Sequence, residues 1–269
     1  MTGAARYVRL ILALARYGLA RELAFRGNFL AKIFVEVLWL SILLIFYRTI
    51  FTQTSVVAGW SEAEYLFFVG CYFALEGLIE TLFLSNCSEF SELVRTGDLD
   101  FFLIRPIDEQ FLITCRAIDW STAPNVLMGL GVMVTALVQL GWPVTVAQVV
   151  LFVPLFFSGL LLAYSFLVML TATAVWFVRN QSLLEMWWLF TSLMRYPKEV
   201  FTGPLGGPIH WFFTFLFPVM LVINVPARTM VKVFEPWFAV YIVVATVLML
   251  WVSRRVFRYA LNSYRSASS

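Results

Sequence analysis

The sequence predicts an all-α integral membrane protein with six transmembrane helices, an amphipathic N-terminal interfacial helix and a re-entrant hairpin between the fifth and sixth spans. The first observation is composition: 61% of the 269 residues are hydrophobic and 13% are charged, whereas a soluble domain carries about a quarter charged residues. The second is that the apolar residues form stretches close to the roughly 20 residues that cross a bilayer. The third is that the basic residues concentrate near the ends of these stretches.

The N-terminal segment, residues 4–26, is expected to lie in the membrane interface. On a helical wheel its arginines fall on one side and its apolar residues on the other, as in helices that bind the headgroup region. A soluble cytoplasmic tail is the alternative. The residues on the two sides are Arg6, Arg9, Arg16 and Arg21, against Val8, Ile11, Ala15 and Leu19.

Six stretches are expected to cross the membrane. The fourth is too long for one straight crossing, so Pro154 and Gly159 are expected to mark a kink or an interfacial start. The expected spans are residues 29–51, 63–86, 117–140, 145–178, 181–197 and 236–253.

The segment 203–228 leaves two interpretations open. Its middle, residues 209–225, is apolar enough for a seventh full span. The central position of Pro218 and the glycine- and proline-rich flanks favour a re-entrant hairpin. Irregular backbone at membrane depth is tolerated only where protein or water covers it, so this hairpin should face other helices. The prolines that interrupt the segment are Pro204, Pro208, Pro218 and Pro226.

The arginines orient the chain, because cytoplasmic loops carry an excess of basic residues. With six crossings, both termini, the loop 87–116 and the turn 179–181 share a side that is rich in arginine, and the loops 52–62 and 141–144 contain none. Both termini are therefore expected to be cytoplasmic. A seventh span would place the C-terminal arginines outside. Four basic residues around the hairpin oppose the rule, namely Arg195, Lys198, Arg228 and Lys232.

Ionisable residues inside predicted spans are candidates for function, because an Asp at the bilayer centre costs at least about 2.5 kcal/mol. Glu76 and Glu80 share one face of the second span, with no basic residue within a turn in sequence. They are candidate translocation-pathway residues that line a cavity for cationic or amphipathic substrates. Alternatively, they pair with arginines of another helix or of the N-terminus. Lys32 and Glu36, four residues apart in the first span, are expected to neutralise each other or to snorkel.

A charged segment at residues 87–108 separates the second and third spans. Apolar residues recur in it at helical spacing with charged residues between them, which predicts a short amphipathic helix followed by the apolar run FFLI and ended by Pro106. From this pattern alone, an interfacial helix that merely joins two spans is equally possible. The apolar positions are Phe90, Leu93, Val94, Gly97 and Phe101.

Two motifs resemble those of ABC-2 type permeases, in the bacterial branch of poorly characterised exporter subunits. The first is the run Arg95-x-Gly97-x-Leu99-Asp100-x-x-Leu103-x-Arg105-Pro106. The second is Arg195-Tyr196-Pro197 with Phe201, followed by the steps Phe217-Pro218 and Val225-Pro226. The order of spans, the N-terminal helix and the hairpin are also similar, so the resemblance covers essentially all of 1–269 as a single ABC-2 type transmembrane domain.

In that family the loop between the second and third spans carries a coupling helix that docks into a groove on an ATP-binding subunit. The resemblance gives this role to residues 88–106 here. Charges of both signs would set the register, and Leu93 and Phe101 would be apolar anchors. The implied ATPase-coupling residues are Glu89, Glu92, Leu93, Arg95, Asp98, Asp100, Phe101 and Arg105.

The chain is not expected to be an enzyme or to bind a nucleotide or a metal. None of its lysines follows a glycine, so there is no GxxxxGK[ST] phosphate loop, and it has one histidine, His210. The resemblance therefore implies two copies of a separate ABC ATPase subunit, which bind ATP and Mg, and a second permease that is identical or a sister chain. It places the assembly in the bacterial cytoplasmic (inner) membrane, with the lipid bilayer and no nucleic acid as further partners.

The function expected from these observations is the permease subunit of an ATP-driven exporter whose substrate the sequence does not identify. Gly70, Ala74 and Gly77 form a small-residue stripe on the second span, which usually indicates close helix packing and here could also help form the seam between two permeases. The alternative is a secondary transporter driven by an ion gradient, with Glu76 and Glu80 as the carrier site. Inverted repeats would favour that alternative, and no clear repeat is present.

Overall fold

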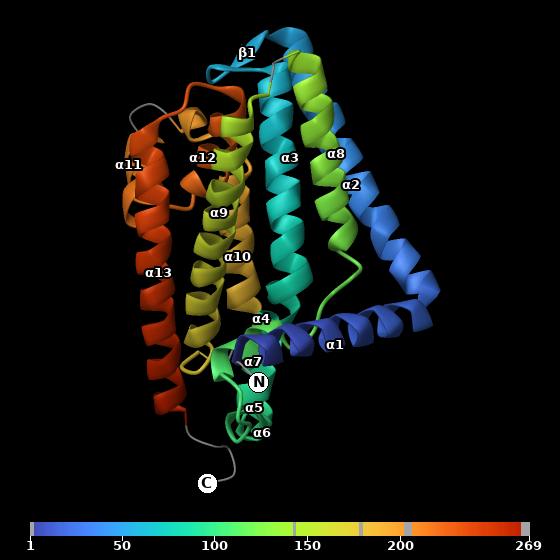
Figure 1. Ribbon diagram of the computed structural model, residues 1–269, viewed down its shortest axis with the longest axis vertical. Coiled ribbons are helices and arrows are strands. Elements are labelled where there is room, and N and C mark those ends of the chain that lie inside the picture. The colour runs from blue at the N-terminus through green and yellow to red at the C-terminus, as the bar shows by residue number, and fades with distance from the viewer. Residues whose placement is uncertain (1–2, 142–143, 178–179, 202–205, 265–269) are drawn as a thin grey trace.

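A computed structural model describes residues 3–141, 144–177, 180–201 and 206–264. Most helices run along the long axis of the molecule, and α1 lies across its lower end (Figure 1). The elements in chain order are α1 (Gly3–Ala24), α2 (Arg26–Gln53), β1 (Val56–Val57), β2 (Trp60–Ser61), α3 (Glu62–Ile79), η1 (Glu80–Leu84), α4 (Ser85–Ser88), α5 (Phe90–Thr96), α6 (Asp100–Leu103), α7 (Glu109–Cys115), α8 (Ala123–Leu140), α9 (Val146–Thr173), α10 (Asn180–Met194), η2 (Lys198–Val200), α11 (Gly206–Trp211), η3 (Phe212–Leu216), α12 (Leu221–Val231) and α13 (Pro236–Ser263).

The helices fit the predicted class of an all-α membrane protein. Among the described residues, five helical stretches are long and apolar enough to cross a bilayer, namely α2, α3 extended to Thr96, α8, α9 and α13. A sixth is reached if the bent pair formed by 206–216 and 221–231 is counted as one span. The helix expected as the fifth span, α10, has 15 residues and falls short of the roughly 20 that cross a bilayer. The count of six spans therefore stays a prediction.

The centre of the molecule is the close packing of α3 against α8. A Cβ atom added at Gly129 of α8 would lie 2.4 Å from the backbone nitrogen of Ala74, and one added at Gly70 would lie 2.8 Å from the carbonyl oxygen of Gly129. The two backbones thus approach as closely as glycine permits. The small-residue stripe of α3, which the sequence assigned to a possible seam between permeases, packs inside this chain.

The segment before α13 is bent, with a largely exposed first arm (α11 and η3) and a buried second arm (α12). The helix ending at Leu216 and α12 meet at an angle of 88°. Almost all of α12 is buried, and its Val222 carbonyl oxygen would lie 2.4 Å from a Cβ placed on Gly159 of α9. Its broken backbone is therefore covered by protein, as expected from sequence. Residues 203–205 of the predicted hairpin lie outside the described residues, and whether the segment is re-entrant or crosses the membrane stays a prediction.

Helix α1 separates from α2 at Phe25 and lies beneath the bundle (Figure 1). Two contacts attach it to the rest of the chain. The indole Nε1 of Trp120 donates a hydrogen bond of 2.8 Å to the Ala15 carbonyl oxygen, and the Tyr7 hydroxyl accepts one of 3.2 Å from the Asp108 backbone. Gly18 permits this approach, because a Cβ there would lie 2.6 Å from the Ile118 carbonyl oxygen. Its placement fits an interfacial helix better than a detached tail.

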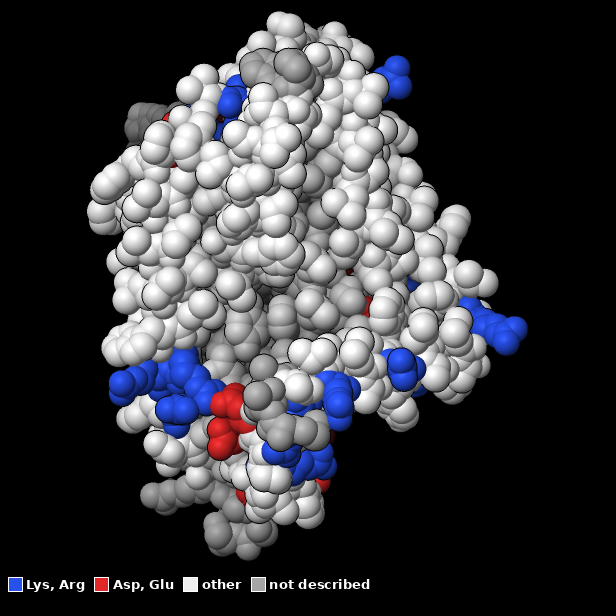
Figure 2. Space-filling model, viewed as in Figure 1, with Lys and Arg blue, Asp and Glu red and all other residues white. Residues whose placement is uncertain are grey.

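Basic side chains gather along α1 and at the lower end of the molecule, and the middle of the visible face is almost uncharged (Figure 2). Two of the four basic residues that oppose the arginine rule form ion pairs with nearby carboxylates. Arg228 forms ion pairs with Glu199 and Glu235, and Lys232 pairs with Glu64 at 3.1 Å. Because these two residues are paired locally, they are weaker indicators of which side of the membrane they face.

Asp108 joins three segments at the lower end. Its carboxylate accepts a hydrogen bond of 3.0 Å from Arg254 Nη1 of α13 and caps the first turn of α7 through the Phe111 backbone, also at 3.0 Å. Partial burial acts to raise the pKa of Asp108, but the hydrogen bonds from Arg254 and Phe111 outweigh it and the pKa lies below its usual value.

We expect Gly129→Ala to destabilise the protein by roughly 1–3 kcal/mol, because the new methyl group meets the α3 backbone. Gly131→Ala is the matched control. A Cβ there meets nothing within 4 Å, so the loss of glycine flexibility should leave stability unchanged or slightly higher. Thermal unfolding of both purified variants in detergent measures the difference. Equal unfolding temperatures for the two variants would contradict the packing.

We expect Asp108→Asn to lower stability at pH 7 by up to about 1 kcal/mol, because asparagine keeps the helix cap and loses the ion pair with Arg254. A carboxylate with a lowered folded-state pKa stabilises above its unfolded pKa of about 3.9, and this contribution disappears as the pH falls through the folded value. Unfolding temperatures of the two proteins should therefore converge below about pH 4. If the difference in unfolding temperature between the two proteins stayed constant down to about pH 3, the charge of Asp108 would not be the source of its contribution.

Candidate functional site

The segment that follows α4 is built from two short helices and not from one. The sequence pattern predicted a single amphipathic helix that reaches Phe101. In the structure α5 ends at Gly97, which has φ +81° and lies in the left-handed region that glycine adopts without strain. The chain turns there, and α6 begins at Asp100. The correction follows from Gly97, whose conformation interrupts the helical periodicity.

The inner face of this segment is anchored to α9 and α13. Phe90, Val94 and Leu99 are buried in one apolar cluster, and the Phe90 and Phe257 rings lie 5.8 Å apart. The other members of the cluster are Ile113, Val168, Ala172, Ala174 and Ala260. Because side chains from α5, α9 and α13 interlock here, the segment and the lower ends of these helices should move together.

The outer face of the segment exposes large apolar side chains at the lower tip of the molecule. Phe101 is 63% exposed and Ile104 is 80% exposed. Ile104 was missing from the residues chosen by sequence, although it belongs to the FFLI run that was noted. Leu93, which was expected to be an anchor, is half-buried against the inner cluster instead.

The charged residues predicted for coupling lie around this tip. Glu92 and Arg95 are exposed and form an ion pair with each other. Glu89 pairs with Arg116 of the loop that returns to the membrane. The remaining predicted residues are Asp98 and Arg105, which are exposed, and Asp100, which is half-buried.

A second candidate site lies at membrane depth, where three helices bring polar groups together. Asn125 Nδ2 of α8 donates hydrogen bonds to Glu36 Oε2 of α2 at 3.0 Å and to Glu80 Oε2 of η1 at 3.4 Å. Within the described parts of the chain, neither carboxylate has a basic partner within 4.0 Å. We call Glu36, Glu80 and Asn125 the acidic cluster. Sequence analysis found Glu80 but missed the participation of Glu36 and Asn125.

Glu76 lies one turn before Glu80 and has different surroundings. It faces the Tyr72 hydroxyl, which accepts a hydrogen bond of 3.3 Å from Arg195 Nη2. The expected pairing of Glu76 or Glu80 with an arginine is therefore absent as a direct contact within the described residues, and Arg195 reaches Glu76 through Tyr72.

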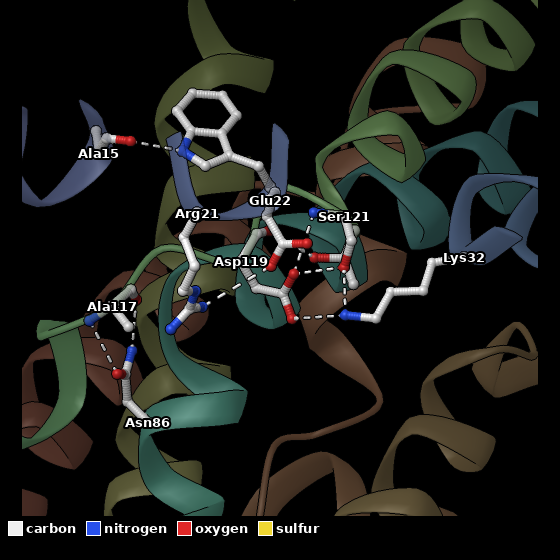
Figure 3. A network of polar contacts seen from close by, with 10 residues as sticks. Ala15, Arg21, Glu22, Lys32, Asn86, Ala117, Asp119 and Ser121 are labelled. Atoms are coloured by element: carbon white, nitrogen blue, oxygen red, sulfur yellow. Dashed lines mark hydrogen bonds and ion pairs between the residues drawn. The ribbon is translucent and has the colours of Figure 1, made fainter. Parts of the chain in front are cut away.

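Lys32 does not pair with Glu36, contrary to the expectation from their spacing. Its ammonium group donates a hydrogen bond of 3.0 Å to Ser121 Oγ and lies 4.0 Å from Asp119 Oδ2. Figure 3 shows Lys32 reaching from α2 toward these two residues, with Arg21 and Glu22 of α1 close by. The side chain thus bridges α2 to the segment before α8.

Two hollows lie along α2. The inner hollow, of about 430 Å³, is lined by Ala31, Lys32, Val35, Glu36, Asp119, Ser121 and Thr122. The outer hollow, of about 580 Å³, is lined by Leu44, Tyr47, Arg48, Phe51, Thr52, Glu62, Tyr65, Leu66, Val69 and Gln139. Only Leu40, Leu43 and Tyr47 of α2 are buried. Contact between α2 and the bundle is therefore concentrated beyond the inner hollow.

Nothing in the described residues resembles a metal site, since no group of three or more His, Cys, Asp or Glu side chains is placed to hold an ion. The two candidate functional features of the described structure are therefore the exposed apolar tip and the polar site beside α2.

Comparison with known proteins identifies the family. A family model described as ABC-2 family transporter protein matches residues 37–268. The match includes the segment 87–108, Glu76, Glu80 and Asn125, and begins one residue after Glu36. No curated protein matches the sequence significantly. Because the match covers most of the chain and agrees with the apolar helices, the chain belongs to the ABC-2 transporter family and is a membrane-embedded permease component of an ATP-binding cassette transporter.

Proposed function

We propose that this chain is the permease subunit of an ATP-driven exporter and that residues 87–108 dock on a separate ATPase subunit. The single observation that supports this most strongly is the two-faced construction of the segment. One face is buried against α9 and α13, and the other presents Phe101 and Ile104 at the tip. Exposed apolar groups that are rimmed by charges mark sites for protein partners.

The docking surface consists of apolar anchors within a charged rim. Phe101 and Ile104 would insert into a groove of the ATPase, because a few buried apolar residues supply most of the energy of an interface. The Glu92–Arg95 pair, Asp98 and Arg105 would set the orientation, which is the usual contribution of rim charges.

Movement of the docked segment would reach the membrane through packed side chains. The contact of Phe90 with Phe257 transmits displacement to α13, and the shared apolar cluster transmits it to α9. Helix α9 in turn contacts the bent segment, where Gly159 meets the Val222 backbone. ATP binding would thus bias the permease between two arrangements for which the substrate has different affinities.

The proposed assembly contains two ATPase subunits, which bind ATP and Mg, and a second permease that completes the pathway. Within this chain the six crossings are α2, the helix that begins with α3, α8, α9, α10 and α13, and the segment 203–228 is re-entrant. Both termini are cytoplasmic, α1 lies in the interface of a bacterial cytoplasmic membrane, and residues 87–108 face the cytoplasm. The transverse position of α1 and the basic lower end support this orientation (Figures 1 and 2).

Replacing both anchors, as Phe101→Asp with Ile104→Asp, should abolish ATPase binding. Loss of two hot-spot residues costs at least about 2 kcal/mol each, roughly a thirtyfold loss of affinity for one. Co-purification of a phosphate-loop ATPase with the tagged permease, expressed in its native host, measures the effect.

Val233→Asp is the matched control, because Val233 is 81% exposed at the opposite end of the molecule. It should retain the ATPase. Retention by the double variant, or a wild-type permease that brings down no ATPase and whose transport follows an ion gradient, would overturn the proposal.

Cysteine labelling tests the re-entrant arrangement. In a Cys115→Ser background, the variants Gly207→Cys and Val233→Cys should both react with a membrane-impermeant thiol reagent from outside the cell, and Ile104→Cys should react only after permeabilisation. The native Cys71 and Cys87 are buried, which keeps the background low. If 206–231 were a full span, Gly207→Cys and Val233→Cys would be labelled from opposite sides.

A further inference from the structure

We propose that the acidic cluster and the inner hollow bind the protonated amine of an amphipathic substrate that enters sideways from the inner half of the bilayer. This inference deepens the proposed function, because it assigns a substrate class to the pathway of the exporter. It depends on three features: a deficit of hydrogen-bond donors in the cluster, an ammonium group already seated in the hollow, and access from the lipid.

The first feature is that the cluster contains more acceptors than donors. Asn125 is only 4% exposed, and its Nδ2 group is the shared donor to Glu36 and Glu80. Its own Oδ1 atom is buried and has no hydrogen-bond partner. A buried amide oxygen without a hydrogen-bond partner is unfavourable, and this one stands beside two carboxylates that lack a cation among the described residues. An ammonium group brings three donors and one positive charge.

The second feature is the Lys32 side chain, which shows what the inner hollow accepts. Its ammonium group is held by Ser121 Oγ at 3.0 Å and lies 4.0 Å from Asp119 (Figure 3). The walls of the hollow are therefore chemically suited to a primary amine. Lys32 is tethered to α2 and lines the hollow together with Glu36, which lies one helical turn further along.

The third feature is the position of the hollow. Glu36 is about 15 Å along α2 from Arg26, at 1.5 Å per residue, and Asn125 lies in the first turn of α8, so the site is toward the inner ends of these helices. Val35, which lines the hollow beside Glu36, is 59% exposed, so an apolar tail can leave the hollow along α2 into the lipid. A volume of about 430 Å³ lies within the range of small-molecule sites, roughly 300–1,000 Å³.

The same features exclude two simpler occupants. Among the described residues no group of three or more His, Cys, Asp or Glu side chains is placed to hold a metal ion, which favours an organic cation. Arg195 approaches Glu76 through Tyr72 and does not reach Glu36 or Glu80, so the cluster is not neutralised by the chain itself. We therefore assign the amine to the wall of the hollow formed by Glu36, Asp119 and Ser121, with Glu80 and Asn125 behind Glu36 as its hydrogen-bonded neighbours.

The test measures binding of a fluorescent alkylamine with one free amino group, a dansylated diaminododecane, to the full-length permease in nanodiscs. Its N-acetylated analogue, which has the same length and no charge, is the ligand control. Glu36→Gln combined with Glu80→Gln should weaken binding of the amine at least tenfold and leave the weak binding of the acetylated analogue unchanged. Glu185→Gln, at an exposed position of α10, is the matched protein control and should bind as the wild type does.

The variant Lys32→Met should strengthen binding of the amine, opposite to the effect of the Gln double variant. Removing the tethered ammonium releases Asp119 and Ser121, so the amine should bind several-fold more tightly. Equal binding of the amine and its acetylated analogue, undiminished binding to the Gln double variant, or unchanged binding to Lys32→Met in a folded protein would overturn the proposal. Because no ATPase is present, failure here leaves the docking proposal intact, and failure of docking leaves this result intact.

Discussion

The bilayer supplies no hydrogen-bond partners, and this constraint governs where polar groups can stand in the protein. Arg228 and Lys232 satisfy it through ion pairs with Glu199, Glu235 and Glu64. The broken backbone before α12 satisfies it by being buried against α9. The acidic cluster leaves the requirement unmet at the Asn125 oxygen, which is one of several buried side-chain atoms of the described residues, Trp187 Nε1 and Thr214 Oγ1 among them, that have no hydrogen-bond partner. Such a deficit at membrane depth is understandable if a substrate supplies the missing groups.

A second constraint is mechanical: force applied to a loop must reach the membrane helices. A loop that is attached only at its two chain ends would bend and would not transmit the force to the membrane helices. Here the side chains of Phe90, Val94 and Leu99 fill a cluster whose other walls are α9 and α13, and Asp108 adds an ion pair to Arg254. Close-packed interiors deform little, so the segment and the lower ends of both helices form one unit.

The fold class, most helix positions and the family could be predicted from sequence, because hydropathy and arginine distribution are strong signals in a membrane protein. The break at Gly97 could not, since a glycine within a helical pattern is compatible with either continuation or a turn, and tertiary contacts of Leu99 decide between them. The end of α10 was expected at Pro197, because a proline is a common helix stop, whereas the helix already ends at Met194.

The side-chain partners in the membrane site could not be predicted from sequence either, because they are set by tertiary contacts. A spacing of four residues brings Lys32 and Glu36 onto one face of α2, which made their pairing the natural prediction. The structure offers Lys32 an alternative in Ser121 and Asp119, and it places Asn125 against Glu36. Both partners lie about 90 residues away in sequence. No local pattern identifies contacts at that separation, although an acidic residue without a basic neighbour in sequence did mark Glu80.

The two sites are connected through α1. Tyr7 contacts the backbone of Asp108, at the end of the segment 87–108, and Ala15 is bonded to Trp120, beside the entrance of the inner hollow. Helix α1 continues through Phe25 into α2, whose first half is bonded to the bundle by Lys32 to Ser121 and by Asn125 to Glu36. Displacing the segment would therefore shift α1 and change the separation of α2 from Asp119 and Ser121. An amine seated between these walls would in turn resist that shift, because a coupling between two binding sites acts equally in both directions.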